Sequence, residues 1–410
     1  MTKSSCRFCD TPLNQTFADL GMSPLANSFV SVERARSMEP FYPLHAYVCS
    51  SCRLVQLEEF ESPQHIFSDY LYFSSFSESW LRHCEAYAVK MVERFRLDGT
   101  SQVVEIASND GYLLQFFKQR GVPVLGVEPA ANVAKVAVEK GIPTEVAFFG
   151  HATAERLRDA GMAADLIASK NVLAHVPDIN DFVAGYKALL KPDGVVTVEF
   201  PHLLRLIEEN QFDTIYHEHF SYLSFFVVEK IFARHGLVLF DVEDLPTHGG
   251  SLRIYACHAE DRSKTVSASV NAMREREFAA GLDDPARYDQ FARQVVETKL
   301  AVLDFFVEAK RAGKRIAAYG AAAKGNTLLN YCGVRSELID FTVDRSPHKQ
   351  GKLLPGTRIP IRAPEAILES KPDYVFILPW NLSDEIVEQM EAVRSWGGKF
   401  VVPIPRIRIF

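Results

Sequence analysis

The sequence predicts an α/β protein with two doubly wound sheets that follow a small cysteine-containing lobe. Apolar strand segments alternate with helix-forming segments over residues 101–202 and again over residues 313–381. Such alternation is typical of parallel sheets covered by helices on both faces. Two Cys-x-x-Cys pairs near the start of the chain indicate the separate lobe. We therefore expect three consecutive domains, at residues 1–63, 64–258 and 259–410.

Length and composition agree with several ordinary globular domains. The chain has 410 residues, of which 47% are hydrophobic and 24% charged, and its formal net charge is −7. An acidic balance argues against a nucleic-acid-binding protein, which usually has a basic face. No apolar run reaches the roughly 18 residues that a membrane span needs, and "MTKSSCRFCD" contains no apolar signal core. We expect a cytoplasmic protein without nucleic-acid or membrane partners, either a monomer or a weak oligomer.

The two Cys-x-x-Cys pairs predict a structural zinc site. A two-residue spacer lets both thiolates of a pair reach one tetrahedral Zn²⁺, and four protein ligands leave no open position. The alternative is chance spacing of buried cysteines. The segment between the pairs leans acidic and is longer than the roughly 15–20 residues of common zinc modules, which disfavours a nucleic-acid-binding ribbon. The predicted zinc ligands are Cys6, Cys9, Cys49 and Cys52.

The first strand–loop–helix, "SQVVEIASNDGYLLQFF" at residues 101–117, favours S-adenosylmethionine over a dinucleotide. A dinucleotide needs G-x-G-x-x-G, which lets pyrophosphate approach the backbone, whereas this loop offers one glycine and an acid. S-adenosylmethionine carries an ammonium, a sulfonium and a ribose diol. We expect Glu105 and Asp110 to face its methionine end and Glu128, at the end of the next strand, to accept its ribose hydroxyls. Alternatively, Glu128 caps a helix or pairs with a lysine.

A second strand–loop–helix, "GKRIAAYGAAAKGNTLLNY" at residues 313–331, suits a phosphate. Its small residues let a ligand touch the backbone, the helix N-terminus offers N–H groups, and Lys324 adds a positive charge. Asp344 ends the next strand, and "PDYVFILPWN" is a third strand that ends near Trp380. The alternative is an ordinary helix start with solvated lysines.

Five motifs follow one another along the chain: "EIASNDGYLL", "NVLAHV", "VEFPH", "YHEHFSYLS" and "HGGSLR". Together with the cysteine pairs and "LGMSPLAN", they resemble the sugar C-3′-methyltransferases of antibiotic deoxysugar pathways, over nearly the whole chain. One departure is Ala107, where relatives often carry glycine, and we expect it to crowd the cofactor loop slightly.

The resemblance implies the roles of many residues. It implies S-adenosylmethionine as the methyl donor and a nucleotide-diphosphate ketosugar, expected to be linked to dTDP, as the substrate. The implied cofactor-binding residues are Glu105, Ala107, Asn109, Asp110, Gly111, Glu128 and Asn171. The implied substrate-binding residues are His248, Arg253, Tyr319, Lys324, Asn326, Asp344 and Trp380. The implied catalytic residues are His219, Tyr216, Glu218, His175 and Tyr70.

The stretch "TIYHEHFSYLS", residues 214–224, could hold a metal through His217 and His219 or could move a proton. Methylation at a carbon beside a ketone needs a base to form an enolate, and a neutral histidine suits this task. The resemblance implies His219 as the base, with Tyr216 and Glu218 beside it. In an extended segment these two would point away from His217 and His219, but in an irregular segment that division fails.

Three other functions remain open. The first is O- or N-methylation of a nucleotide-linked sugar, which uses the same donor without an enolate. The second is a binding protein that has lost its chemistry, although Tyr216, Glu218 and His219 argue against such a loss. The third is a zinc-dependent nucleic-acid module, which the acidic balance disfavours.

Overall fold

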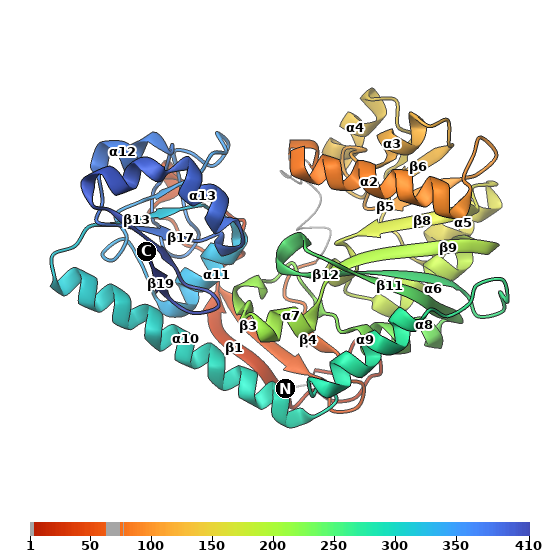
Figure 1. The fold of residues 1–410 in the computed structure, drawn as a ribbon, viewed down its shortest axis with the longest axis horizontal. Helices are drawn as coiled ribbons and strands as arrows, with labels where there is room; N and C mark the ends of the chain where they lie inside the picture. The colour runs from red at the N-terminus through yellow and green to blue at the C-terminus, as the bar shows by residue number, and fades with distance from the viewer. Residues whose placement is uncertain (1–3, 63–73, 77) are drawn as a thin grey trace. The chain divides into compact units, whose positions relative to one another are not determined.

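The computed structural model describes residues 4–62, 74–76 and 78–410, and the chain forms two compact units (Figure 1). Unit 1 contains residues 1–13, 49–203 and 220–283, and unit 2 contains residues 14–48, 204–219 and 284–410. Each unit is therefore built from separated segments of the chain, so the compact units divide it differently from the three consecutive domains of the sequence analysis, which stay a prediction. Residues 14–48 join the C-terminal region, and residues 259–283 join unit 1.

Unit 1 is built on a seven-stranded sheet in the order β11-β12-β9-β8-β5-β6-β7. Five strands are parallel, while β12 runs antiparallel to both of its neighbours. This arrangement confirms the predicted doubly wound sheet. The strands are β5 (Val103–Ile106), β6 (Val124–Val127), β7 (Thr144–Glu145), β8 (Ala164–Lys170), β9 (Leu190–Pro201), β11 (Leu237–Leu245) and β12 (Ser251–His258).

Helices cover both faces of this sheet (Figure 1). Helix α2 (Glu78–Phe95) buries Cys84, Tyr87, Ala88 and Met91, a spacing that puts one apolar stripe against the core. With α2 lie α3 (Leu114–Lys118) and α4 (Ala131–Glu139). The other face carries α5 (His151–Asp159), α6 (Ile179–Leu189) and α8 (Phe225–Arg234), and α9 (Ala268–Ala279) packs near β11.

Unit 2 contains a six-stranded sheet in the order β16-β14-β13-β17-β18-β19, parallel except at β19. Its strands are β13 (Ile316–Tyr319), β14 (Thr342–Val343), β16 (Ile361–Arg362), β17 (Tyr374–Ile377), β18 (Lys399–Val402) and β19 (Arg408–Ile409). The helices are α7 (Leu203–Glu208), α10 (Pro285–Arg311), α11 (Ala323–Cys332), α12 (Glu365–Ser370) and α13 (Ser383–Gln389). This is the predicted Rossmann-like sheet.

Residues 14–48 belong to unit 2 because they pack on its longest helix. Strand β1 (Gln15–Ser23) pairs antiparallel with β3 (Tyr42–Val48), and the ring of Phe17 stacks on Phe291 of α10 at 4.7 Å between ring centroids. Strand β2 (Val30–Ser31) pairs with β15 (Lys352–Leu353). Aromatic pairs of this kind add to the free energy gained by burial. Residues 14–48 therefore belong to unit 2 because of their tertiary packing, although they lie between the two cysteine pairs in the sequence.

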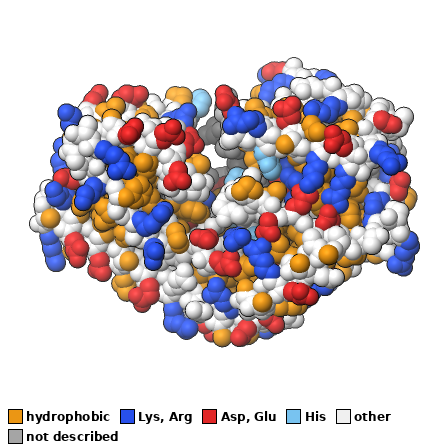
Figure 2. All heavy atoms as spheres, viewed as in Figure 1, with side chains coloured by type: hydrophobic (Ala, Val, Ile, Leu, Met, Phe, Trp, Pro, Cys, Tyr) orange, Lys and Arg blue, Asp and Glu red, His pale blue; other side chains and the backbone are white. Residues whose placement is uncertain are grey.

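Acidic and basic side chains are interspersed on the face drawn in Figure 2, without a surface of one sign. That mixture agrees with the modest net charge of −7. Among the described residues, no helix is both long and apolar enough to cross a membrane.

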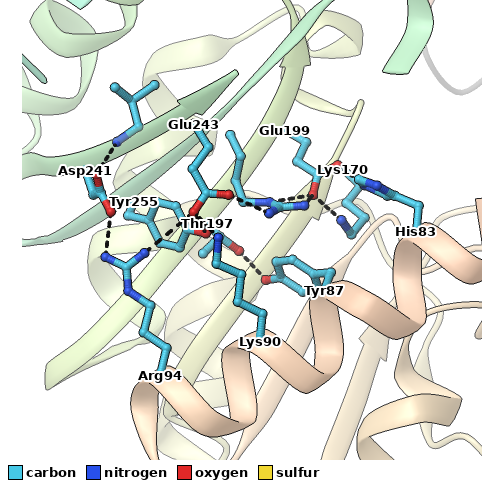
Figure 3. A network of polar contacts seen from close by, with 12 residues as sticks. His83, Tyr87, Lys90, Arg94, Lys170, Thr197, Glu199, Asp241, Glu243 and Tyr255 are labelled. Carbon is cyan, nitrogen blue, oxygen red and sulfur yellow. Dashed lines mark hydrogen bonds and ion pairs between the residues drawn. The ribbon is translucent and has the colours of Figure 1, made fainter. Parts of the chain in front are cut away.

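A buried network of charges crosses the sheet of unit 1 (Figure 3). Glu199 of β9 forms ion pairs with Lys170 of β8 and with Arg253 of β12, and it also contacts His83 of α2 at 3.0 Å. Arg253 continues to Glu243 of β11 at 2.9 Å. Burial acts to raise the pKa of Glu199, but Lys170, His83 and Arg253 outweigh it and hold the pKa well below its usual range.

We expect Glu199→Gln to lower the free energy of unfolding by about 3–5 kcal/mol at pH 7, because Lys170 and Arg253 lose their shared counter-charge. Since the folded-state pKa of Glu199 is lowered, its contribution is present above the unfolded carboxyl pKa of about 4 and is lost at lower pH. Urea unfolding at several pH values measures this. Glu260→Gln, at an exposed pair with Lys187, should change nothing measurable; equal losses in both variants would contradict the assignment.

Candidate active site

The loop after β5 is shaped by three residues with positive φ. Ala107 has φ 56°, Asn109 has φ 48° and Gly111 has φ 76°. The N–H of Asn109 donates to Oε2 of Glu128 at 2.9 Å, and the N–H of Ala130 donates to Oε1 of the same side chain at 2.8 Å. Glu128 therefore fixes the loop and also the start of α4. Burial raises its pKa.

The other predicted acids of this loop differ in their surroundings. Glu105 is fully buried at the end of β5, and burial raises its pKa well above the usual range, opposed by Tyr112 and Lys170. Asp110 pairs with Lys140 of the segment after α4 at 3.0 Å. Glu105 is thus held in a low-dielectric setting, whereas the charge of Asp110 is compensated by Lys140. Both side chains lie at the carboxyl edge of the parallel strands, where a ligand is expected.

Two further predicted residues meet at this edge of the sheet. Asn171, directly after β8, has φ 55° and its side-chain nitrogen lies 3.0 Å from Nε2 of His248. The ring of Trp80 lies 5.4 Å from that of His248. His175 is half-buried at the end of a short 3₁₀ helix, Leu173–His175. Tyr70 lies outside the described residues.

Arg253 is placed differently from the expectation. Its guanidinium is buried in β12 and donates to Glu199 at 2.8 Å and to Glu243 at 2.9 Å. Both carboxylates belong to the network of Figure 3. These two internal partners give Arg253 a structural role in the sheet, and its binding of substrate stays a prediction. The sequence alone did not suggest this, because its partners lie 54 and 10 residues away.

The stretch around His219 is a turn and not an extended strand. The N–H of His219 donates to the carbonyl of Tyr216 at 2.9 Å, and the two rings lie 4.0 Å apart between centroids. Tyr216 and His219 are therefore neighbours, and the division by alternating faces fails. The short 3₁₀ helix Phe212–Thr214, η4, precedes this turn.

The ring of His219 is oriented by a backbone carbonyl. Nδ1 lies 2.8 Å from the carbonyl oxygen of Thr214. A carbonyl can only accept, so Nδ1 carries the proton and, in the neutral ring, Nε2 carries the lone pair. This is the tautomer that a proton-abstracting Nε2 requires.

His217 and Glu218 are both buried in unit 2. Nε2 of His217 lies 3.2 Å from the carbonyl of Pro43, and burial lowers its pKa. Oε1 of Glu218 accepts from Asn27 at 2.6 Å, and burial raises the pKa of Glu218. Asn27 belongs to the "LGMSPLAN" motif, whose partner was not apparent from the sequence. Among the described residues, only the four cysteines form a group of three or more possible metal ligands, so His217 and His219 lack the companions of a metal site.

The loop after β13 brings several predicted residues together. Gly320 has φ 99°, and a Cβ there would lie 2.5 Å from Cδ of Pro379, so the position requires glycine. Asp344 accepts from the N–H of Ala321 at 2.8 Å. Nζ of Lys324 lies 4.6 Å from the ring centroid of Trp380.

Two residues predicted to bind substrate here have partners within unit 2. The side-chain nitrogen of Asn326 donates to the carbonyl of Ala26 at 2.6 Å, and the hydroxyl of Tyr319 donates to Gln389 at 3.2 Å. Both side chains are buried. These contacts help to hold the loop, and the binding of substrate by Asn326 and Tyr319 stays a prediction.

The four cysteines form a cluster in unit 1 that fits a zinc ion. Sγ of Cys6 lies 3.6 Å from Sγ of Cys52, and Sγ of Cys9 lies 3.5 Å from Sγ of Cys49. A tetrahedron with Zn–S bonds of about 2.3 Å has edges of about 3.8 Å, close to these separations. The backbone N–H of Cys52 points at Sγ of Cys49 at 3.5 Å, which suits a thiolate. The structure thus brings together the four predicted zinc ligands, Cys6, Cys9, Cys49 and Cys52.

Arg7, which sequence reasoning missed, connects the cysteine cluster to the loop after His175. Its guanidinium donates to the carbonyls of Pro177 and Leu57, each at 2.5 Å. Asn180 donates in turn to the carbonyl of Arg7 at 3.1 Å. The cluster therefore braces the start of α6. Its position between Cys6 and Cys9 was the feature of the sequence that could have indicated a role for Arg7.

The fold, the loop after β5 and the cluster of four cysteines define a methyltransferase that uses S-adenosylmethionine and has a structural zinc site. Family models match as a zinc binding domain over residues 6–67, a methyltransferase domain over residues 80–242 and a C-methyltransferase C-terminal domain over residues 246–405.

The chain is 36% identical to the C-methyltransferase NovU of Streptomyces niveus over 98% of this chain and 96% of that protein. It therefore belongs to the C-methyltransferase family, as the motifs predicted. A ubiquinone biosynthesis O-methyltransferase of Bartonella bacilliformis is 29% identical over 24% of this chain and 40% of that protein. Magnesium protoporphyrin IX methyltransferase of Synechocystis PCC 6803 with bound S-adenosylmethionine is 14% identical, with a TM-score of 0.35, over 48% of this chain and 88% of that chain.

We expect Cys52→Ser, or treatment with a strong chelator, to remove one zinc ion per chain and to loosen the Arg7 contacts, because the metal stabilises the folded cluster. Metal analysis and hydrogen exchange over residues 4–13 and 176–180 measure both effects. Cys332→Ala removes a buried thiol of unit 2 and should keep the zinc and the exchange pattern. Unchanged exchange in metal-free protein would contradict the bracing role.

We expect Ala107→Gly to raise the free energy of unfolding by about 0.5–1 kcal/mol, because relief of the left-handed strain exceeds the added freedom of the unfolded chain. Thermal or urea unfolding measures it. The matched change Ala160→Gly, at φ −78°, should lower stability by a similar amount. A loss of stability in both variants would show that φ at Ala107 stores no strain.

Proposed function

We propose that the protein methylates C-3 of a nucleotide-diphospho-4-ketosugar through an enolate, with His219 as the base. The observation that carries this proposal is the contact of Nδ1–H with the Thr214 carbonyl at 2.8 Å, which leaves the lone pair of the neutral ring on Nε2. A fixed tautomer and orientation are what a general base needs.

The neighbours of His219 support the enolate step. Nε2 takes the C-3 proton, and the electrons of the C–H bond move toward the 4-keto oxygen. Tyr216 packs against the imidazole at 4.0 Å between ring centroids, so its hydroxyl is a suitable donor to the enolate or the sugar. Glu218 lies in the same turn, and burial raises its pKa, opposed by the hydrogen bond from Asn27.

Unit 1 holds the methyl donor in the proposed reaction. S-adenosylmethionine, when bound, would supply the methyl group to the enolate carbon and depart as S-adenosylhomocysteine. Glu105 and Asp110 would face its methionine end, and the carboxylate of Glu128 its ribose. Glu128 already accepts two backbone N–H groups, so the diol would use its remaining lone pairs.

Unit 2 supports recognition of a diphosphate. Lys324 lies at the first turn of α11, where N–H groups and a positive charge favour an anion. Asp344 holds the loop through the N–H of Ala321. Thymidine diphosphate is the expected carrier of the sugar.

The test is proton exchange. In D₂O with a thymidine-diphospho-4-keto-6-deoxysugar, the wild type should exchange the C-3 proton, and with S-adenosylmethionine the product should gain one methyl group. His219→Asn should slow exchange by about 10²–10⁴-fold, the usual contribution of general base catalysis. The wild-type rate should fall at acid pH, because the protonated ring has no lone pair.

His45→Asn is the matched control, since His45 is a half-buried histidine of unit 2 that contacts Thr16 at 2.9 Å outside the turn. It should exchange like the wild type. Methyl gain without C-3 exchange would indicate O-methylation. Binding without exchange or methyl gain would leave a binding protein.

A further inference from the structure

Asp213 is a fully buried carboxyl group whose second oxygen has no partner among the described residues. It lies in η4 immediately before Thr214, and its Oδ2 accepts from Nε1–H of Trp380 at 2.8 Å. Its Oδ1 makes no hydrogen bond within the described part of the chain. A buried carboxylate is costly unless another charge compensates it.

Lys324 of α11 provides that charge. Trp380 is the common neighbour, because its indole N–H contacts Asp213 and its ring lies 4.6 Å from Nζ of Lys324. Burial raises the pKa of Asp213 to about 6, opposed by Lys324, Trp380 and nearby backbone N–H groups. Burial lowers the pKa of Lys324, opposed by Asp213.

Few other titratable groups face Asp213. Helix α11 also supplies Tyr331, whose ring lies 5.5 Å from that of Phe212 and carries Nζ of Lys299 at 4.5 Å. The segment Trp380–Leu382 offers no titratable side chain. The titratable residue His219 lies in the turn that follows η4. Lys324 is therefore the dominant charge that can respond to a ligand.

The backbone beside Asp213 leads directly to His219. The carbonyl of Thr214 accepts from Nδ1–H of His219 at 2.8 Å, and the carbonyl of Ile215 accepts from the hydroxyl of Thr327 at 3.1 Å. Lys324 and Thr327 are three residues apart, on one side of α11. Helix α11 thus holds Ile215 by a hydrogen bond, and its Lys324 lies against the Trp380 ring whose N–H contacts Asp213.

We propose that Asp213 is a positioning residue that couples a diphosphate bound at Lys324 to the state of His219. This coupling rests on the function proposed above. A diphosphate shares the ammonium of Lys324 and places a second negative charge beside Asp213. Asp213 then takes one proton from solvent, and no covalent bond other than the new O–H forms or breaks.

The consequence for the base follows from charge. An ionised Asp213 favours the protonated form of His219, which has no lone pair to accept the C-3 proton. The bound diphosphate adds its own negative charges, which also favour the protonated imidazole. The proton that Asp213 takes up removes the charge of Asp213, so it offsets part of this effect and limits the loss of the neutral base when the substrate binds.

The experiment is calorimetric titration of wild-type protein with thymidine-diphospho-glucose or uridine-diphospho-glucose at pH 7, in buffers of different ionisation enthalpy. Both phosphates of these probes are esterified, so the probes do not titrate near neutrality. Wild type should take up about 0.5–1 proton more than Asp213→Asn, since a nearby anion raises a carboxyl pKa. The variant should bind within about threefold of wild type, whereas Lys324→Met should bind at least about tenfold more weakly.

Kinetics give the second readout. Asp213→Asn should move the acid limb of kcat/KM to lower pH and leave the acid limb of kcat in place, because the substrate already neutralises Asp213 in the wild-type complex. A purely structural role would not separate the two profiles. Thr298→Val, which removes a buried hydroxyl that contacts Asn210 at 2.6 Å, should change neither profile nor proton uptake.

Identical proton uptake and pH profiles in wild type and Asp213→Asn, with C-3 exchange intact, would overturn the coupling and leave the proposed function standing. Asp213-dependent proton uptake without any C-3 exchange would support the coupling and remove the enolate chemistry. Failure of wild type to bind either probe would overturn the assignment of the diphosphate to Lys324, whether or not C-3 exchange is seen.

Discussion

The ion pair between Lys170 and Glu199 is the interaction on which unit 1 depends. It joins the two central strands β8 and β9 where both are buried, and Arg253, Glu243 and the charges of α2 extend it to the sheet edge (Figure 3). Because an unpaired buried charge is far more costly than a satisfied one, these side chains must be placed together. The next residue after Lys170 is Asn171, so the network also fixes one wall of the cofactor edge.

Unit 2 meets a similar requirement with hydrogen bonds between distant segments. Asn27 contacts Glu218, and the carbonyl of its neighbour Ala26 accepts from Asn326, so a single loop connects the His219 turn with helix α11. Thr327 of α11 provides another connection through its hydrogen bond to the carbonyl of Ile215. The proposed base and the proposed phosphate site are therefore parts of one hydrogen-bonded assembly within unit 2.

The sequence predicted what local pattern can encode. Strand–loop–helix alternation gave both sheets, and cysteine spacing gave the zinc ligands, since each depends on residues close together in the chain. It did not predict the division into units, because β1 is held by α10, roughly 270 residues later, through Phe17 and Phe291. Asp213 and Asn27 were missed because their meaning lies in partners 167 and 191 residues away. The partners of Arg253 in the sheet, Glu199 and Glu243, were not apparent from the sequence for the same reason.

The motif "YHEHFSYLS" contains a boundary that its sequence does not reveal. The chain passes from unit 2 to unit 1 between His219 and Phe220. In unit 1, the carbonyl of Phe220 accepts from the N–H of Leu57 at 3.0 Å, Arg7 lies over the Phe220 ring at 5.4 Å, and Ser221–Tyr222 pair with Val55–Gln56. Phe220 is therefore held within unit 1 by Leu57 and by Arg7, the residue after Cys6, whereas Ile215 is held within unit 2 by Thr327 of α11.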